Sequence, residues 1–325
     1  RYAESSILNK SMHPMILALV PEEAIPPLHE ELALQADLSS RRSRMIRLAA
    51  RALGEVMEGF PFNPALPVFL ALPENPAGHP PFDHEDFLRH VAVQADLSLD
   101  LDQSRIFPSG RAGGFQALEA AMQWLEQGKA NHILCGGVDS YLDLHLLNAL
   151  DQEGRVLSEG VMDGFAPGEG ASFLLLGTES ARNTFAEGAM AKVHAPGLAS
   201  ETGHRYSDAP YQGDGLAQAV CSALDPADGD LIRTVMAGFN GENLGAKEWG
   251  VAFLRNHAAF DGNYRIEHPA DCFGDTGAAM GPLLIGMAAM GMQKGHLPCQ
   301  ALVFCASDHE LRAAARVTFE SKKEK

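Results

Sequence analysis

One pattern occurs twice in this chain: a turn of small residues, an apolar helix, a glycine stop and a buried strand. The first copy, GGFQALEAAMQWLEQGKANHILCGGVDS, covers residues 113–140, and the second, GAAMGPLLIGMAAMGMQKGHLPCQALVFCASD, covers residues 277–308. In each copy a glycine, Gly128 or Gly295, stands just past the helix, as C-caps require. Both strands end in small residues and an aspartate. The two copies predict a chain built from two related halves.

Apolar runs alternate with helical patterns along the rest of the sequence, which predicts an α/β protein with largely buried sheets. We expect the halves to cover residues 1–178 and 179–325 and to share one compact body. The expected strands are residues 14–20, 66–73, 131–138, 171–177, 231–239 and 300–307. The expected helices are residues 44–59, 114–128, 213–224 and 280–295.

Composition excludes several classes of protein. The net charge of −17 argues against a nucleic-acid binder and against an acidic membrane surface as partner. No apolar run approaches the roughly 20 residues that span a bilayer. The five cysteines are scattered without a CxxC pair, and the 13 histidines show no HExxH spacing. We therefore expect reduced cysteines, no metal site and a cytoplasmic protein. The chain begins at Arg1 rather than Met, which is compatible with removal of a leader or a tag.

Arginines gather in one stretch, SSRRSRMIRLAARAL, at positions 41, 42, 44, 47 and 51. Arg44, Arg47 and Arg51 would share one face of a helix. One interpretation is a solvated helix face, which is the usual role of a charge run. The other is a docking surface for an acidic partner.

Two segments resemble β-ketoacyl synthases. GKANHILCGGVDSYLD, residues 128–143, is similar to the strand that follows the nucleophile helix of that family. DGFAPGEGASFLLLGTESAR, residues 163–182, is similar to the family's DGFxxGEGAxxxxL segment, a structural element close to the active site. In the second half, GFNGENLGAKEWG (238–250) resembles the loop that carries the first catalytic histidine. CFGDTGAAMGPLLIGMAAM (272–290) resembles the turn and helix that carry the second. The likeness extends from about Met45 to the C-terminus.

The resemblance implies a thiolase-like fold, in which two similar αβ halves stack as helix, sheet, helix, sheet, helix. It also implies catalysis by a cysteine thiolate at a helix N-terminus, assisted by two histidines. Here Arg111 stands at the cysteine position, Asn240 at the first histidine position and Gly274 at the second. An arginine is neither nucleophile nor base, and an asparagine cannot shuttle a proton. Decarboxylative condensation is therefore not expected.

Three interpretations of the altered site remain open. In the first, Arg111 pairs with Glu242 or Asp275 in a purely structural network. In the second, Arg111 and the amides of the helix N-terminus bind an anionic ligand. In the third, residual acyl transfer or hydrolysis uses Ser109, Cys272 or Glu242.

Other candidates are weaker. One apparent triad is formed in the sequence by Ser307, Asp308 and His309. Neighbours along a strand point to alternate faces, however, so these residues cannot form a triad alone. Four further residues are expected to pack in the interior: Cys135, Cys305, Trp124 and Trp249.

The resemblance thus implies a non-catalytic partner or a ligand-binding subunit, comparable to a chain length factor. The alternatives are an acyltransferase or 3-oxoacyl synthase with a rebuilt site, and a scaffold dimer without a ligand. Implied partners are an acyl carrier protein or a coenzyme A thioester, without a cofactor. A homodimer, or a heterodimer with a sister synthase, would form by pairing sheet edges across the first half.

Overall fold

Two sheets form the centre of the computed structural model, which describes residues 2–35, 38–58, 60, 65–75, 82–178, 191–224 and 231–319. In the first sheet β3 is parallel to β4 and β5, whereas β6 is antiparallel to β5. Its order is β4 (Arg105–Phe107), β3 (Val68–Ala71), β5 (His132–Ser140) and β6 (Glu169–Gly177). In the second sheet β9 is parallel to β10 and β11, and β12 is antiparallel to β11. Its order is β10 (Phe260–Glu267), β9 (Ile232–Ala237), β11 (Gln300–Ala306) and β12 (Leu311–Phe319), with β7 (Ala191–Val193) and β8 (Gly197–Ser200) both paired to β12.

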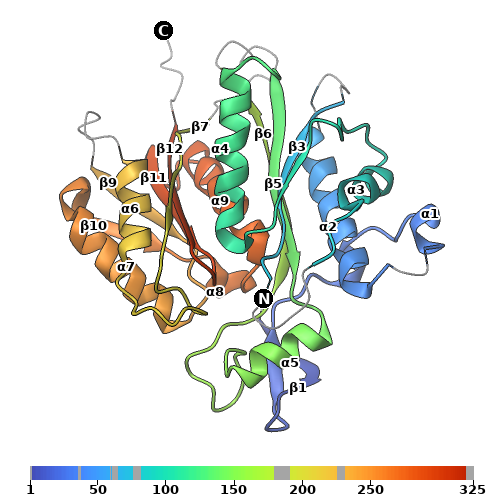
Figure 1. Ribbon diagram of the computed structural model, residues 1–325, viewed down its shortest axis with the longest axis horizontal. Helices are drawn as coiled ribbons and strands as arrows, with labels where there is room; N and C mark the ends of the chain where they lie inside the picture. Colours follow the sequence, from blue (N-terminus) through green and yellow to red (C-terminus); the bar gives the residue numbers. More distant parts are fainter. Residues whose placement is uncertain are drawn as a thin grey trace.

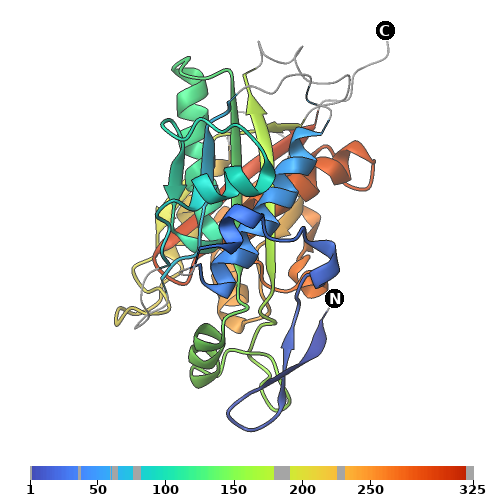
Figure 2. The ribbon, with the colours of Figure 1, turned by 90° about the vertical axis from the view of Figure 1, so that its right-hand side faces the viewer.

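Helices and sheets alternate in five layers (Figure 1). The middle layer is α4 (Gly113–Glu126) and α9 (Met280–Gln293), which pack between the two sheets. The outer layers are α2 (Ser40–Met57) with α3 (Phe87–Ala95), and α6 (Asp214–Ala223) with α7 (Asn243–Asn256). Side chains alternate along the strands accordingly: Phe69 faces the middle helices, and Val68 and Leu70 face α2 and α3. Figure 2 shows the molecule from the α2 and α3 side. The predicted α/β, thiolase-like architecture is confirmed.

The repeated pattern is visible at both ends of the middle helices. A 3-10 turn precedes each helix: η2 (Gly110–Ala112) before α4 and η6 (Gly277–Ala279) before α9. Each helix ends in a Schellman-type cap, in which Lys129 N donates to Trp124 O at 3.1 Å and His296 N donates to Gly291 O at 2.8 Å. The first sheet comes from one half of the sequence and the second from the other. The boundary expected between residues 178 and 179 adjoins residues 179–190, which lie outside the described residues, so the division stays a prediction.

All ten expected strands and helices are present, and the sequence missed several others. A small lobe at the bottom of Figure 1 consists of β1 (Ala3–Leu8), β2 (Pro14–Leu17) and α5 (Leu144–Gln152) around its own apolar cluster. The stretch 238–250, compared above with a loop, becomes helical at Asn243 because Asp163 Oδ1 accepts a hydrogen bond from Asn243 N at 2.7 Å. Four further short elements are η1 (Glu22–Ala24), α1 (Glu30–Ala33), η5 (His257–Ala259) and α8 (Ala270–Phe273). Within the described ranges no helix combines the length and the apolar character needed to cross a membrane.

The arginine stretch of α2 is neither a solvated face nor a free docking surface, so both interpretations were wrong for most of it. The side chains of Arg41, Arg42, Arg44 and Arg47 are only 11–14% exposed, and each is ion-paired within the chain. Arg51, which is 62% exposed, pairs only with Glu55 on its own helix. The arginines tie α2 to the rest of the first half, because their side chains lie over neighbouring segments instead of in water.

Arg44 anchors Glu169 of the DGFAPGEGA segment. Its Nε and Nη2 donate to the two oxygens of the Glu169 carboxylate at 2.6 and 2.7 Å. The same carboxylate also accepts hydrogen bonds from Val20 N and Ser140 Oγ, both at 2.8 Å. The glutamate of this motif therefore joins three segments of the first half at the start of β6.

We expect Arg44→Ala to lower the free energy of unfolding by about 1.5–3 kcal/mol, the usual worth of hydrogen bonds to a charged group. Glu169 would lose its cation but keep two other donors, which limits the loss. Arg51→Ala, the matched control on the same helix, should change it by less than about 1 kcal/mol because that pair is exposed. Urea denaturation of both variants gives the comparison, and equal effects would contradict this view of α2.

Candidate functional site

Polar residues follow the ends of four central strands and meet between the two halves. Glu74 follows β3, Tyr141 follows β5, Asn240 follows β9 and Asp308 follows β11. The carboxyl ends of parallel strands are where α/β proteins build their sites. Six charged side chains lie here, four of them buried and two, Arg205 and Asp308, partly exposed: Arg111, Arg155, Arg205, Glu242, Asp275 and Asp308.

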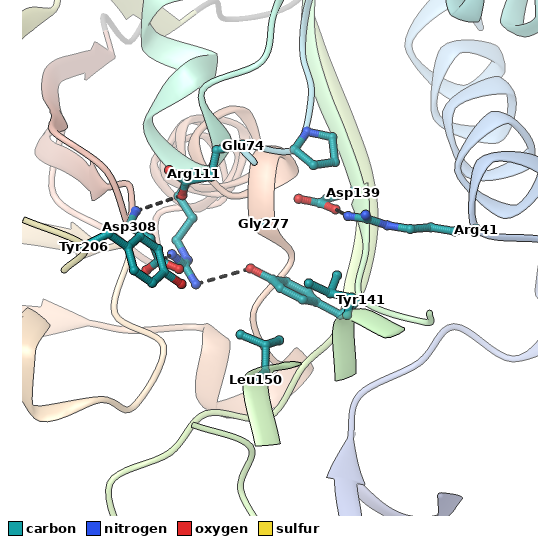
Figure 3. Close-up of a pocket in the computed structure, with 12 residues that line it drawn as sticks. Arg41, Glu74, Arg111, Asp139, Tyr141, Leu150, Tyr206, Gly277 and Asp308 are labelled. Carbon is teal, nitrogen blue, oxygen red and sulfur yellow. Dashed lines mark hydrogen bonds and ion pairs between the residues drawn. The ribbon is translucent and has the colours of Figure 1, made fainter. Parts of the chain in front are cut away.

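Arg111 projects from η2 into the centre of this cluster (Figure 3). Its Nε donates to Asp275 Oδ2 at 2.7 Å, and its Nη2 donates to the same oxygen. Nη1 donates to Asp308 Oδ1 at 3.0 Å, and Nη2 also donates to Tyr141 OH at 3.2 Å. Burial disfavours the charged guanidinium, but Asp275, Tyr141 and Asp308 together outweigh it and raise the pKa of Arg111 well above its usual range. Arg111 is therefore a permanent cation that is only 4% exposed.

Asp308 pairs with all three arginines, the most distant being Arg205, whose Nε lies 3.5 Å from Oδ1. Besides Arg111 it accepts from Arg155, whose Nη1 lies 2.8 Å from Oδ2 and whose Nη2 lies 3.0 Å from Oδ1. Burial on its own would raise the pKa of Asp308, but the charges of Arg111 and Arg155 hold it well below the usual range. Asp308 is consequently ionised and links the network across the cleft.

Glu242, at the N-cap of α7, is the third carboxylate. Arg155 donates to both of its oxygens at 2.9 Å, and Arg205 Nη2 lies 2.9 Å from Oε1. Asn240 Nδ2 donates to Glu242 Oε2 at 2.8 Å and to Asp275 Oδ2 at 3.2 Å. The residue at the first histidine position thus joins two carboxylates and holds no proton that it could exchange.

The guanidinium groups of the network are all paired, and little space remains between them. Three guanidinium groups face Asp275, Asp308 and Glu242, with Glu153 Oε2 a further 3.6 Å from Arg155 Nη1, and the cavities that remain beside Arg111 measure about 30 and 40 Å³. A water needs roughly 10–15 Å³ in such a cavity, so each has room for a few waters at most. The first interpretation of the sequence matches this geometry in part: Arg111 pairs with Asp275 and not with Glu242, which belongs to Arg155. The second interpretation was an anion site. All three guanidinium groups are already bound by carboxylates, so the structure offers no unpaired guanidinium in the network for an anion.

Glu74 lies at the edge of this network. Its carboxylate accepts from Asp308 N at 2.8 Å and from His309 N at 3.0 Å. Burial raises the pKa of Glu74 to about 7, and the nearby charge of Asp308 adds to that effect. The sequence analysis missed Glu74, Arg155 and Arg205. No local motif marks them, because each is recruited by the fold from a loop at a strand or helix end.

Of the remaining candidates, Asp308 belongs to the network described above, whereas Cys272 and the two neighbours of Asp308 have other surroundings. Cys272 is exposed on α8, away from the network. Ser307, Asp308 and His309 lie in the turn between β11 and β12, not in a strand as expected. They face different partners: Ser307 Oγ accepts from Ala112 N at 3.1 Å, and His309 Nε2 lies 2.7 Å from Asn75 O. They form no triad, for a different reason from the one expected.

Ser109 lies just before η2, on the rim of an open groove of about 530 Å³. The groove is also lined by Glu74, Gln116, Ser307 and His309. Ser109 therefore lines a wide, open groove, whereas Arg111 lies beside two small cavities.

Gly274 adopts a backbone conformation that side chains avoid. Its φ is 76° and its ψ is −175°, a region occupied essentially by glycine alone. A Cβ there would lie 2.6 Å from Ala18 Cβ and 2.8 Å from Ala166 O. The second histidine position therefore has no room for an imidazole in this fold.

The DGFAPGEGA segment packs against the arginine network. The Phe165 ring centre lies 5.8 Å from the Arg111 guanidinium carbon and 5.3 Å from that of Arg155, within the range of cation–π contact. Asp163 holds the first residue of α7, next to Glu242. The motif therefore has a structural role beside the site, as expected.

Reactivity of the five cysteines offers a direct check of this description. Burial raises the pKa of Cys135 to about 12 and also raises that of Cys305, and both side chains are fully buried as expected. Cys221, Cys272 and Cys299 are exposed. We expect three thiols to react with a colorimetric disulfide reagent in the native protein and five after unfolding. A fourth fast-reacting native thiol would contradict the interior described here. The expected packing roles of Trp124 and Trp249 are confirmed, since both contact core clusters.

The family described as Beta-ketoacyl synthase, N-terminal domain, matches residues 107–182. A curated relative, 3-oxoacyl-[acyl-carrier-protein] synthase 2 of Mycobacterium leprae, is 23% identical over 208 residues. The match covers 58% of this chain and 48% of the relative, so it spans about half the relative's length.

Three solved structures share the arrangement of the whole chain. The ishigamide ketosynthase/chain length factor has a TM-score of 0.69 at 16% identity, covering 94% of this chain and 88% of that one. The ketosynthase from module 6 of the bacillaene synthase of Bacillus subtilis 168 has a TM-score of 0.66 at 15% identity, covering 88% and 59%. A type II polyketide acyl carrier protein in complex with its ketosynthase gives 0.64 at 17% identity, covering 88% and 87%. At these identities the likeness establishes the fold.

Proposed function

We propose that this chain, a β-ketoacyl-synthase-like protein of thiolase-like fold, does not catalyse decarboxylative condensation and acts as the non-catalytic partner of an active sister synthase. The observation that best supports this proposal is the ion-paired network of Arg111, Arg155 and Asp308, which lies where a condensing enzyme would hold its acyl group. A condensing enzyme needs a thiolate and two imidazoles there, and this cleft supplies ion pairs instead.

The proposal includes a dimer that extends the first sheet. In the described part of the first sheet, β4 pairs only with β3, which leaves one edge of β4 open. An open edge presents unpaired backbone groups that can template pairing with a second chain. The sister synthase would supply the matching edge, and an acyl carrier protein would deliver substrate to that subunit. This role is comparable to that of a chain length factor.

Co-expression with a candidate sister synthase tests the proposal. We expect a 1:1 complex by light scattering, and condensation of acyl and malonyl thioesters only when both chains are present. Replacing the sister's nucleophile should abolish condensation, whereas Ser109→Ala in this chain should leave it unchanged. Condensation by this chain alone would contradict the proposal, and so would an active sister that neither binds this chain nor responds to it.

A second candidate, acyl transfer or hydrolysis through a rebuilt site, is favoured by one observation. Ser109 lines an open groove of about 530 Å³ together with His309, so a hydroxyl and an imidazole share a space that could hold a substrate. Under this alternative, turnover of acyl thioesters would require Ser109, and Ser109→Ala would abolish it.

A further inference from the structure

Two histidines and a glutamate from distant parts of the sequence meet beside the open groove. His204 lies in the loop that follows β8, and His309 and Glu310 lie in the turn between β11 and β12. One ring nitrogen of each histidine and one carboxylate oxygen of Glu310 lie within 4.8 Å of one another. Small side-chain adjustments would bring three such atoms to the roughly 2.0–2.2 Å at which zinc is bound.

His309 is oriented as metal-binding histidines are. Its Nε2 lies 2.7 Å from the carbonyl oxygen of Asn75. A carbonyl oxygen can only accept, so Nε2 carries the hydrogen and the neutral ring keeps its lone pair on Nδ1. A backbone carbonyl that fixes the tautomer and the ring in this way is the usual outer partner of a metal-ligating histidine. His309 Nδ1 is thus the atom that a metal would take.

His204 supplies an independent observation. Its Nδ1 is buried and has no hydrogen-bond partner within the described chain. A buried polar atom without a partner costs about 1–3 kcal/mol. The ring lies against that of His309, with centroids 5.6 Å apart. The loop holds this ring beside a second imidazole although its Nδ1 is unpaired. A metal ion bound by both rings would give that nitrogen a partner.

From these contacts we propose that His204, His309 Nδ1 and the carboxylate of Glu310 bind one divalent transition-metal ion of the zinc class. Two imidazoles and one carboxylate form the ligand set that zinc accepts, whereas calcium and magnesium prefer oxygen alone. Three protein ligands leave a fourth coordination position open. His309 and Glu310 also line the groove that contains Ser109. The metal would therefore lie at the wall of that groove, where an anionic or carbonyl group of a small molecule could complete its coordination.

This site is separate from the arginine network and does not depend on the proposed function. It uses none of the positions 111, 240 and 274, and a chain that never condenses could still bind the ion. Its failure would leave the partner role intact, and loss of the partner role would leave the metal site intact.

Equilibrium dialysis of the full chain against zinc sulfate, after treatment with a chelator, tests the site. We expect one tightly bound zinc per chain, and a rise in melting temperature on loading that the chelator reverses. His204→Ala and His309→Ala should each weaken binding by at least about tenfold, since they remove a ligand outright and even outer partners are worth 10–100-fold. Glu310→Gln should weaken it less severely.

His268→Ala is the matched control. His268 lies 2.7 Å from Asp271 on the surface, and both side chains are about half exposed. That pair could collect zinc adventitiously, so the tight site must survive the substitution. When cobalt(II) replaces zinc in the unmodified chain, the visible absorption spectrum should show the bands that are typical of a cobalt ion with few ligands, some of them nitrogen. Absence of stoichiometric zinc in the unmodified chain would overturn the proposal, as would its loss in His268→Ala with retention in His204→Ala.

Discussion

Asp308→Ala is expected to lower the free energy of unfolding by about 3–5 kcal/mol, the cost of removing one partner from a buried ion pair. Asp308 is bound by Arg111 and Arg155, which are 4% and 3% exposed. Without the carboxylate, the three guanidinium groups of the network would face only Asp275 and Glu242, leaving one excess positive charge beside cavities that admit few waters. Denaturation in urea, with an unchanged slope against concentration, measures the loss.

Two comparisons separate this effect from a generic loss of an aspartate. Asp214→Ala removes a carboxylate that is 58% exposed and pairs with Arg255, so it should cost less than about 1 kcal/mol. In the double variant Asp308→Ala/Arg155→Met the excess charge is removed together with its partner. The double variant should therefore lose about 0.5–3 kcal/mol less free energy of unfolding than the sum of the losses in the two single variants, which is the usual coupling for residues in one network. Additive effects would show that the two residues are not coupled.

The second large effect concerns Gly274, which the sequence resemblance predicts at the second histidine position. Gly274→His, and even Gly274→Ala, should destabilise the protein by about 1–3 kcal/mol through the backbone conformation alone. The contact with Ala18 adds about 1–3 kcal/mol of overpacking. Gly54→Ala in α2 is the control, because a Cβ there meets nothing within 4 Å. It should raise stability by about 0.5–1 kcal/mol, the usual gain in a helix interior. A Gly274→Ala variant as stable as the parent would contradict the geometry described.

This second effect has a functional consequence. The triple variant Arg111→Cys/Asn240→His/Gly274→His restores the family's residue types, yet it should gain no condensation activity. The cysteine would leave the buried Asp275 without its cation, and the second histidine cannot be placed. Loss of the triad is therefore supported by the surroundings of the site, and not only by three substitutions.

Much of the fold was predictable because it is repeated and strongly patterned. The copies at residues 113–140 and 277–308 predicted both middle helices and the strands that follow them. The lobe around β1 and α5 was not predictable, since its strands are short and its core is small. Helix α7 escaped prediction because its start depends on Asp163, a residue far away in the sequence.

The site was predictable only where a motif marks it. Arg111, Asn240 and Asp275 were found by their places in family segments, and all three do lie in one network. Arg155 and Arg205 come from turns whose sequence carries no signal. Asp308 was noticed only at the end of the second repeat and in an apparent triad, so its pairing with Arg111 was missed. The arginines of α2 were assigned to a solvated face or a docking surface, whereas they pair with carboxylates of other segments.

The central claim is that this chain forms no acyl-enzyme, and the intact mass of the protein after incubation with acyl and malonyl thioesters tests it most directly. The account predicts that the full chain keeps its unmodified mass under conditions in which an active synthase is acylated completely. A stable acyl adduct that disappears in Ser109→Ala would contradict the account, because it would show a working nucleophile next to the arginine network.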